Sequence, residues 1–153
     1  MSILDHRRGR VILSVSVGVL LGLLAYLGFG AWRSARLGEL AESYRRAHAA
    51  RDIPALEALY CLDGVTPEAR GRFRLALAQE LESPLAAVRI VEDERGQLSA
   101  AVETWRSMGM RPTLPFAGVA LNIEHATSDR LVSTHLIGRD GLTYRLVWVV
   151  RAE

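Results

Sequence analysis

The chain has no lysine, a single cysteine and few aromatic residues. Its 153 residues include 19 arginines, and aromatic side chains make up only 7% of them. Because Cys61 is alone, no intramolecular disulfide can form, and packing must stabilise the fold. Half of the residues are hydrophobic and 24% are charged, which excludes a disordered chain. This length fits one modest domain and is too short for two.

Beyond its first ten residues the chain also lacks an excess of charge of either sign. Residues 1–10 contain three arginines and one aspartate, which account for the whole net charge of +2. Residues 33–153 contain 16 arginines and 16 acidic residues. Nucleic-acid binding needs basic residues concentrated on one face, so the charge distribution argues against such a partner. The absence of a glycine-rich phosphate loop argues against a bound nucleotide.

Residues 11–30 form a long apolar run without charge or proline. Twenty helical residues match a hydrocarbon core of about 30 Å, and Arg10 and Arg33 bracket the run. Tyr26 and Trp32 suit the aromatic belt of a membrane interface. We therefore expect a transmembrane helix over residues 11–32, preceded by a cytoplasmic tail at residues 1–10. The alternative is a cleaved signal peptide, although its apolar region is usually only about 7–15 residues long.

The arginines on the two sides of this run nearly balance, so the orientation rests on the short leading tail. That tail favours a cytoplasmic N-terminus, which predicts a single-pass protein of the bacterial inner membrane with an extracytoplasmic domain. Ser14, Gly18 and Gly22 recur every four residues, a spacing that lets two membrane helices pack closely. The alternative explanation is that small residues are common in such helices.

Helix signals come first in residues 33–153, and strand signals follow. Apolar residues at helical spacing extend the first helix to about residue 50. Asp52 and Thr66 each precede a proline in the first turn and predict two further helix starts. Alternating apolar residues predict strands at residues 87–92, 115–125, 131–138 and 142–151. Residues 97–110 are compatible with a strand, a short helix or an irregular crossover.

The last two predicted strands read as a hairpin. Asp140-Gly141 is typical of a two-residue type I′ turn, and counting outwards from it places Ile137 opposite Tyr144. Neither face of this hairpin is plainly polar, which indicates that one face packs on the helices and the other meets a partner or an adjoining element.

Helices followed by a mostly antiparallel sheet define an α+β domain over residues 33–153, with helices packed on a curved, cone-like sheet. This order and the strings ALYCLDGV, LPFAGVALNIEH and GRDGLTYRLVWVV resemble the nuclear-transport-factor-like, cystatin-like cone superfamily. The Tyr-Cys-x-Asp-Gly string at residues 60–64 is similar to that of some bacterial membrane-anchored proteins. The resemblance implies a fold and no particular active site, because that fold hosts enzymes, binding proteins and scaffolds.

Residues that could perform chemistry are sparse. His125, His135 and Glu124 are the only group with metal-ligand side chains, and no zinc-binding spacing accompanies them, so we expect neither a metal nor another cofactor. Cys61 is expected to be a small buried hydrophobe rather than a nucleophile. By resemblance to cone-fold enzymes, the candidate ligand-binding residues are Asp63, His135, Tyr144 and Trp148.

Two functions follow from these patterns. The first is a membrane-anchored envelope protein that is not an enzyme and whose domain binds or scaffolds another envelope protein or a second copy of itself. Its layout resembles the bitopic inner-membrane scaffold of type IV secretion systems. The alternative is a small-molecule-binding or catalytic domain of the isomerase or dehydratase kind. A scaffold should fill the cone with its own side chains, whereas a ligand site should be an open cavity with a few polar groups.

Overall fold

The computed structural model describes residues 3–127 and 131–151, with side chains described for Leu20 and from Gly22 onwards. Contacts divide the chain into two compact units, Met1–Ala35 and Arg36–Glu153. The helices are α1 (Ile3–Ala49), α2 (Ile53–Ala58), α3 (Pro67–Glu80) and α4 (Gln97–Ser107). The strands are β1 (Tyr60–Cys61), β2 (Leu85–Glu92), β3 (Met110–Pro112), β4 (Phe116–His125), β5 (Val132–Asp140), β6 (Thr143–Val147) and β7 (Val149–Arg151).

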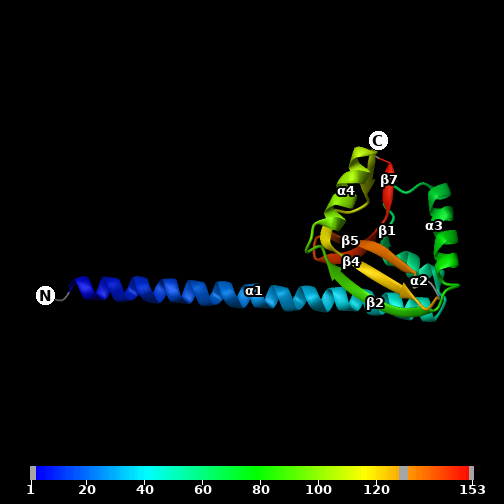
Figure 1. Cartoon of the computed structure of the whole chain (residues 1–153). Coiled ribbons are helices and arrows are strands. Elements are labelled where there is room, and N and C mark those ends of the chain that lie inside the picture. Colours follow the sequence, from blue (N-terminus) through cyan, green and yellow to red (C-terminus); the bar gives the residue numbers. More distant parts are fainter. Residues whose placement is uncertain (1–2, 128–130, 152–153) are drawn as a thin grey trace. The chain divides into compact units, whose positions relative to one another are not determined.

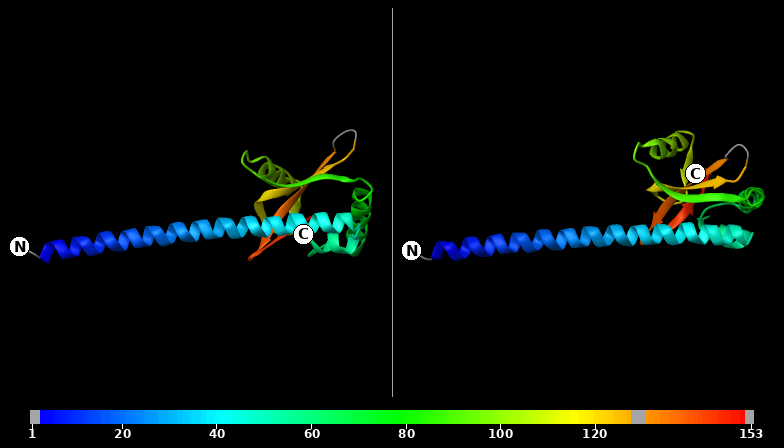
Figure 2. Two further views of the ribbon diagram at one scale, coloured as in Figure 1. Left: turned by 90° about the horizontal axis from the view of Figure 1, so that it is seen from below. Right: turned by 60° about the horizontal axis from the view of Figure 1, so that its bottom comes forward.

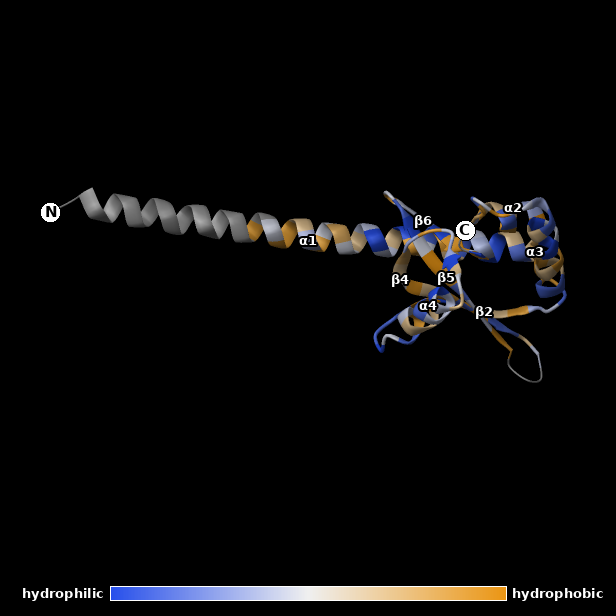
Figure 3. Ribbon diagram, turned by 90° about the horizontal axis from the view of Figure 1, so that it is seen from above, coloured by the Kyte–Doolittle hydropathy of each residue, from blue (hydrophilic) through white to orange (hydrophobic). Residues whose placement is uncertain are grey.

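The described part of the chain contains no helix that is both long and apolar enough to cross a membrane. From Gly22 onwards, Figure 3 shows that α1 begins mostly hydrophobic and then alternates between hydrophilic and hydrophobic residues. The charges of this later part include Arg33, Arg36 and Glu39. The prediction of a transmembrane helix over residues 11–32 is therefore wrong. The localisation that depended on it, a single-pass protein of the bacterial inner membrane with a cytoplasmic N-terminus, is wrong as well.

The second unit is an α+β domain built on a mixed, curved sheet. Five strands pair in the order β1-β6-β5-β4-β2, and β3 pairs with β7 in a separate two-stranded ribbon. All neighbours are antiparallel except β1 and β6, which are parallel. The views in Figures 1 and 2 show β2, β4 and β5 curving across the C-terminal part of α1.

The predicted helix starts are confirmed, and the segment with open alternatives is a helix. The side chains of Asp52 and Thr66 cap α2 and α3 by accepting the backbone N–H of the residue three places on. Residues 97–107 form α4, whose first turn is held by Asp93, which accepts the backbone N–H groups of Leu98 and Ser99. Asp93 therefore caps this helix from outside the usual N-cap position.

The hairpin turn lies one place beyond its predicted position. Asp140 pairs with Thr143, so the two loop residues are Gly141 and Leu142, and Gly141 has a φ of 57°. Leu142 at the second loop position does not have a positive φ, which indicates a type II′ turn, because type I′ needs a positive φ at both loop positions. Ile137 consequently lies opposite Leu146 and not Tyr144. The partner moved by two residues, so the side chains that pair between β5 and β6 kept their predicted faces.

Different helices cover the two faces of the sheet. The face that carries Leu121 and His135 meets the C-terminal part of α1, where Tyr44 contacts the His135 ring at 6.1 Å between ring centroids. On the opposite face, Ala120, Leu136 and Val147 pack against Val102 of α4. Because helices cover both faces of the sheet, neither face of the hairpin is lined by mostly polar residues.

Candidate functional site

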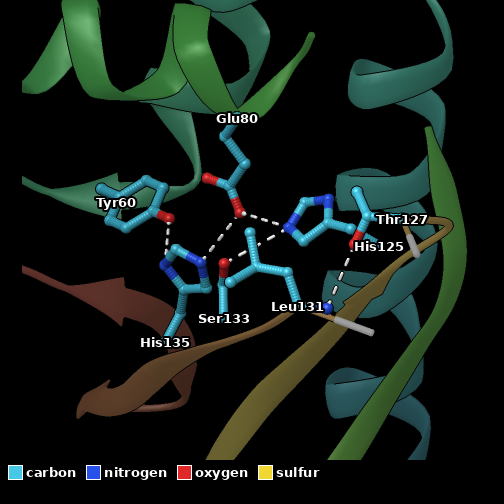
Figure 4. Close-up of polar contacts among 7 residues, drawn as sticks. All are labelled: Tyr60, Glu80, His125, Thr127, Leu131, Ser133 and His135. Carbon is cyan, nitrogen blue, oxygen red and sulfur yellow. Dashed lines mark hydrogen bonds and ion pairs between the residues drawn. The ribbon is translucent and has the colours of Figure 1, made fainter. Parts of the chain in front are cut away.

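Polar side chains from five elements meet between the helices and the sheet. We call them the Glu80 cluster, which consists of Tyr44, His48, Tyr60, Glu80, His125, Ser133 and His135. Tyr44 and His48 lie one turn apart on the buried face of α1, and Glu80 is the last residue of α3. The remaining members come from β1, β4 and β5. Figure 4 shows the carboxylate of Glu80 facing the imidazoles of His125 and His135.

His135 lies at the centre of a hydrogen-bonded chain. Its Nδ1 is 2.7 Å from the Tyr60 hydroxyl, and its Nε2 is 3.1 Å from Oε1 of Glu80. The same carboxylate oxygen is 3.7 Å from Nε2 of His125, which lies 3.3 Å from the hydroxyl of Ser133. One glutamate oxygen therefore faces two imidazoles, and both ring nitrogens of His135 are engaged.

Glu80 needs these partners because its position is unfavourable for a charge. Its side chain is only 11% exposed and stands at the C-terminal end of α3, where the helix dipole disfavours an anion. Burial alone would raise the pKa of Glu80, but the hydrogen bond and charge of His135, helped by Tyr44 and His125, outweigh it and lower that pKa. Glu80 is therefore a carboxylate at neutral pH.

The two tyrosines and His48 are neutral, because burial disfavours the charged form of each of these groups. Burial, reinforced by the negative charge of Glu80, raises the pKa of Tyr44 far above its ordinary value. Burial likewise raises the pKa of Tyr60. Burial lowers the pKa of His48, and the opposing effect of Glu80 is smaller.

The cluster also contains three buried atoms that form no hydrogen bond of ordinary geometry with another described residue, although Tyr44 and His48 both lie close enough to Glu80 to interact with it. They are Oη of Tyr44, Nε2 of His48 and Nδ1 of His125. Buried polar atoms in native proteins usually have a partner, so these three are unusual. No group of three metal-ligand side chains in the described part of the chain is arranged to hold a metal ion. Chemically, the cluster can share or transfer a proton between Glu80 and an imidazole.

The second feature is an open groove of about 550 Å³, which we call the Trp148 groove. Val65, Ala69 and Arg72 line one side of it. Trp148 and β7 line the other side, and Arg151 is the last residue of that strand. The lining of the groove is mostly apolar and includes two arginines, Arg72 and Arg151.

The four residues predicted to bind a ligand occupy separate places. His135 belongs to the Glu80 cluster, whereas Trp148 lies at the groove, with its ring 4.7 Å from that of Phe73 between centroids. Tyr144 is buried and pairs with Arg139 across the hairpin. Asp63 is exposed and lies 3.5 Å from Sγ of Cys61, the buried hydrophobe that the sequence predicts.

The residues predicted to pair membrane helices lie in α1. The side chains of Ser14 and Gly18 are outside the described residues. At Gly22, an added Cβ would meet nothing within 4 Å in the described part of the chain.

Sequence reasoning missed Tyr44, His48, Tyr60 and Glu80 as members of one site. A signal was present in α3, because Glu80 follows Phe73 and Leu77 on the same buried stripe. An acidic residue on an apolar stripe requires a buried partner. The sequence does not identify that partner, since the histidines lie 45 and 55 residues further along the chain.

Comparisons of the chain with models of protein families, with curated proteins and with solved structures found no match. The functional argument therefore depends on the geometry of the Glu80 cluster and of the Trp148 groove.

Proposed function

We propose that the domain formed by residues 36–151 is a noncatalytic binding module that recognises another protein through the Trp148 groove. The supporting observation is that this groove is open and apolar, with half-buried Trp148 and Val65 in its lining. Half-buried aromatic anchors of this kind contribute most to binding energy at protein interfaces.

The enclosed state of the Glu80 cluster supports the same choice. Glu80 and His135 form hydrogen bonds with members of the cluster itself, and neither lines a described groove. His125 lines a second hollow, but its side chain is only 1% exposed there. A general acid or base has to reach the substrate proton, directly or through one water molecule. The side chain of His135 is 19% exposed, but Tyr60 and Glu80 engage both of its ring nitrogens, so a substrate would have to compete with one of them.

The three unpartnered atoms of the cluster favour a second candidate, a small-molecule or catalytic site inside the domain. Such a ligand would have to be small and polar, because it would bridge Tyr44, His48 and His125. The two candidates differ in what happens when Glu80 is removed. Catalytic groups often reduce stability, so their replacement raises it, whereas replacing a structural charge lowers it.

A peptide-display experiment tests the proposal. The full chain is panned against a random peptide library, and enriched peptides are measured by fluorescence polarisation. We expect Ala69→Gln, which fills the groove without removing a packed ring, to weaken their binding at least tenfold. The matched control is Ala100→Gln on α4, outside the groove. Failure to enrich any peptide, or equal binding by both variants, would contradict the proposal.

A further inference from the structure

We infer that the Trp148 groove takes an extended acidic segment of a partner protein, which adds a strand to the free edge of β7. This inference rests on the proposed function and names the partner's chemistry. It depends on the backbone of β7, on the place of the groove beside it and on two arginines.

The backbone of β7 offers unused hydrogen-bonding groups. The N–H of Thr113 donates to the carbonyl of Trp148 at 2.8 Å, and Arg111 pairs with Val150. Hydrogen-bonded pairs alternate along an antiparallel ladder, so the backbone groups of Val150 also face β3. Those of Val149 and Arg151 therefore point away from β3. Among the described strands, β7 pairs with β3 alone.

The groove lies along this unpaired edge. It is lined by β7 on one side and by Val65, Ala69 and Arg72 on the other, and no residue of β3 contributes to it. Figure 1 shows α3 across from β7, on the side away from α4. An extended chain in the groove would meet the free N–H and C=O groups of Val149 and Arg151. Addition of a strand to an exposed edge is a recurring mode of peptide recognition.

The charge of the groove determines which kind of peptide segment can bind there. The side chains of Arg72 and Arg151 are exposed and form no hydrogen bond or ion pair with another described residue, whereas those of Arg70 and Arg74 both pair with Glu57. Among the described residues, the charged side chains that line the groove are these two arginines, and none is acidic. A guanidinium binds a carboxylate through two parallel hydrogen bonds. The occupant therefore carries carboxylates.

The two requirements together define the sequence pattern of the partner. Side chains of a strand alternate between two faces, so one set can pack on Trp148 and Val65 while the other carries the acidic groups. An apolar and acidic alternation over four to six residues satisfies both requirements.

The test uses a fluorescein-labelled, end-capped hexapeptide of alternating valine and glutamate, measured by fluorescence polarisation against the full chain. The expected result is saturable binding that a valine and lysine hexapeptide does not reproduce. Two versions of the probe are N-methylated, one at its odd-numbered and one at its even-numbered residues. Because only every second residue of an added strand bonds to β7, one version should lose binding and the other should bind within about threefold of the unmethylated probe. Equal effects in the two versions would overturn strand addition.

The arginines are tested by Arg72→Gln and Arg151→Gln, each expected to weaken binding of the hexapeptide at least fivefold. Arg95→Gln, which removes the same charge from the loop before α4, is the matched control and should bind as the unmodified chain does. If display-selected peptides bind through the groove but the valine and glutamate hexapeptide does not, the inference fails and the proposed function stands. If no peptide binds, both fail. Concentration-dependent self-association lost in Arg72→Gln would overturn the inference in favour of a second copy of the chain.

Discussion

The Glu80 cluster and the Trp148 groove differ in whether their charged side chains have partners. In the cluster, a buried carboxylate faces two imidazoles, and its hydrogen bond goes to His135. At the groove, Arg72 and Arg151 are exposed and have no ion-pair partner among the described residues. A buried charge without a partner would be costly, whereas an exposed one costs little and stays available to a ligand. We therefore propose that the cluster stabilises the fold and that the groove serves recognition.

The two regions are joined by packed rings. Phe73 lies 4.7 Å from Trp148 and 4.7 Å from Tyr60 between ring centroids, and Tyr60 contacts His135. Large disruptions of the cluster can therefore reach the groove through Phe73. Conservative substitutions are needed to separate the two roles.

The largest expected effect is that of Glu80→Ala. It removes the partner of His135 and leaves polar groups buried, so we expect a loss of about 3–5 kcal/mol in the free energy of unfolding. Urea unfolding followed by circular dichroism measures it. Glu103→Ala, which breaks only the exposed pair with Arg106, is the control and should cost under about 1 kcal/mol. A variant more stable than the parent would indicate that the cluster is an active site.

Gly141→Val tests whether a loss of stability outside the cluster and the groove leaves peptide binding unchanged. The φ of 57° at Gly141 lies in the left-handed region, which a β-branched residue strongly disfavours. We expect the free energy of unfolding to fall by about 1–3 kcal/mol. Binding of the hexapeptide should be unchanged at temperatures where the variant is folded. Thermal melts and fluorescence polarisation check the two statements, and an unchanged melting temperature would refute the turn.

The pH dependence of stability should report the cluster. Because the pKa of His48 is lowered in the folded state, its contribution is complete above the ordinary value of 6.5 and is lost as pH falls below it. The pKa of Glu80 is also lowered, so its contribution is complete above the ordinary value of 4.5 and is lost at more acid pH. We expect melting temperatures to fall in both windows. His48→Leu should flatten the first window and leave the second, and equal profiles would contradict this assignment.

The smallest effect on stability is expected from Arg72→Gln and Arg151→Gln. Both side chains are exposed, so each free energy of unfolding should change by no more than about 0.5 kcal/mol. A urea midpoint and slope equal to those of the parent would show that any loss of peptide binding is local. A large destabilisation would mean that these arginines support the fold.

The local elements were predictable where a short-range signal determines them. Asp52 and Thr66 predict the starts of their helices because a cap acts over three residues. The alternation of apolar residues predicts the faces of the paired residues of β5 and β6, even though the turn between them was misplaced. The helix over residues 97–107 escaped prediction because its cap, Asp93, lies outside the usual N-cap position. The transmembrane prediction depended on the apolar run over residues 11–30 alone, and it failed because no helix in the described part of the chain is both long and apolar enough to cross a membrane.

The candidate sites were harder to predict, because they depend on tertiary contacts. His135 was singled out from its residue type, but its partners Glu80 and Tyr60 are 55 and 75 residues distant in the sequence. The groove exists because the strand that was predicted as one piece breaks at Trp148, where β6 ends and β7 turns to pair with β3. No local pattern marks that break.

The most direct test of the division between stability and recognition is an NMR titration of the full, isotopically labelled chain with the valine and glutamate hexapeptide. We expect the backbone amide shifts to concentrate at residues 64–72 and 148–151, with the largest change at Val149 or Arg151. Shifts centred on Tyr44, Glu80 and His135, with none along β7, would contradict this expectation.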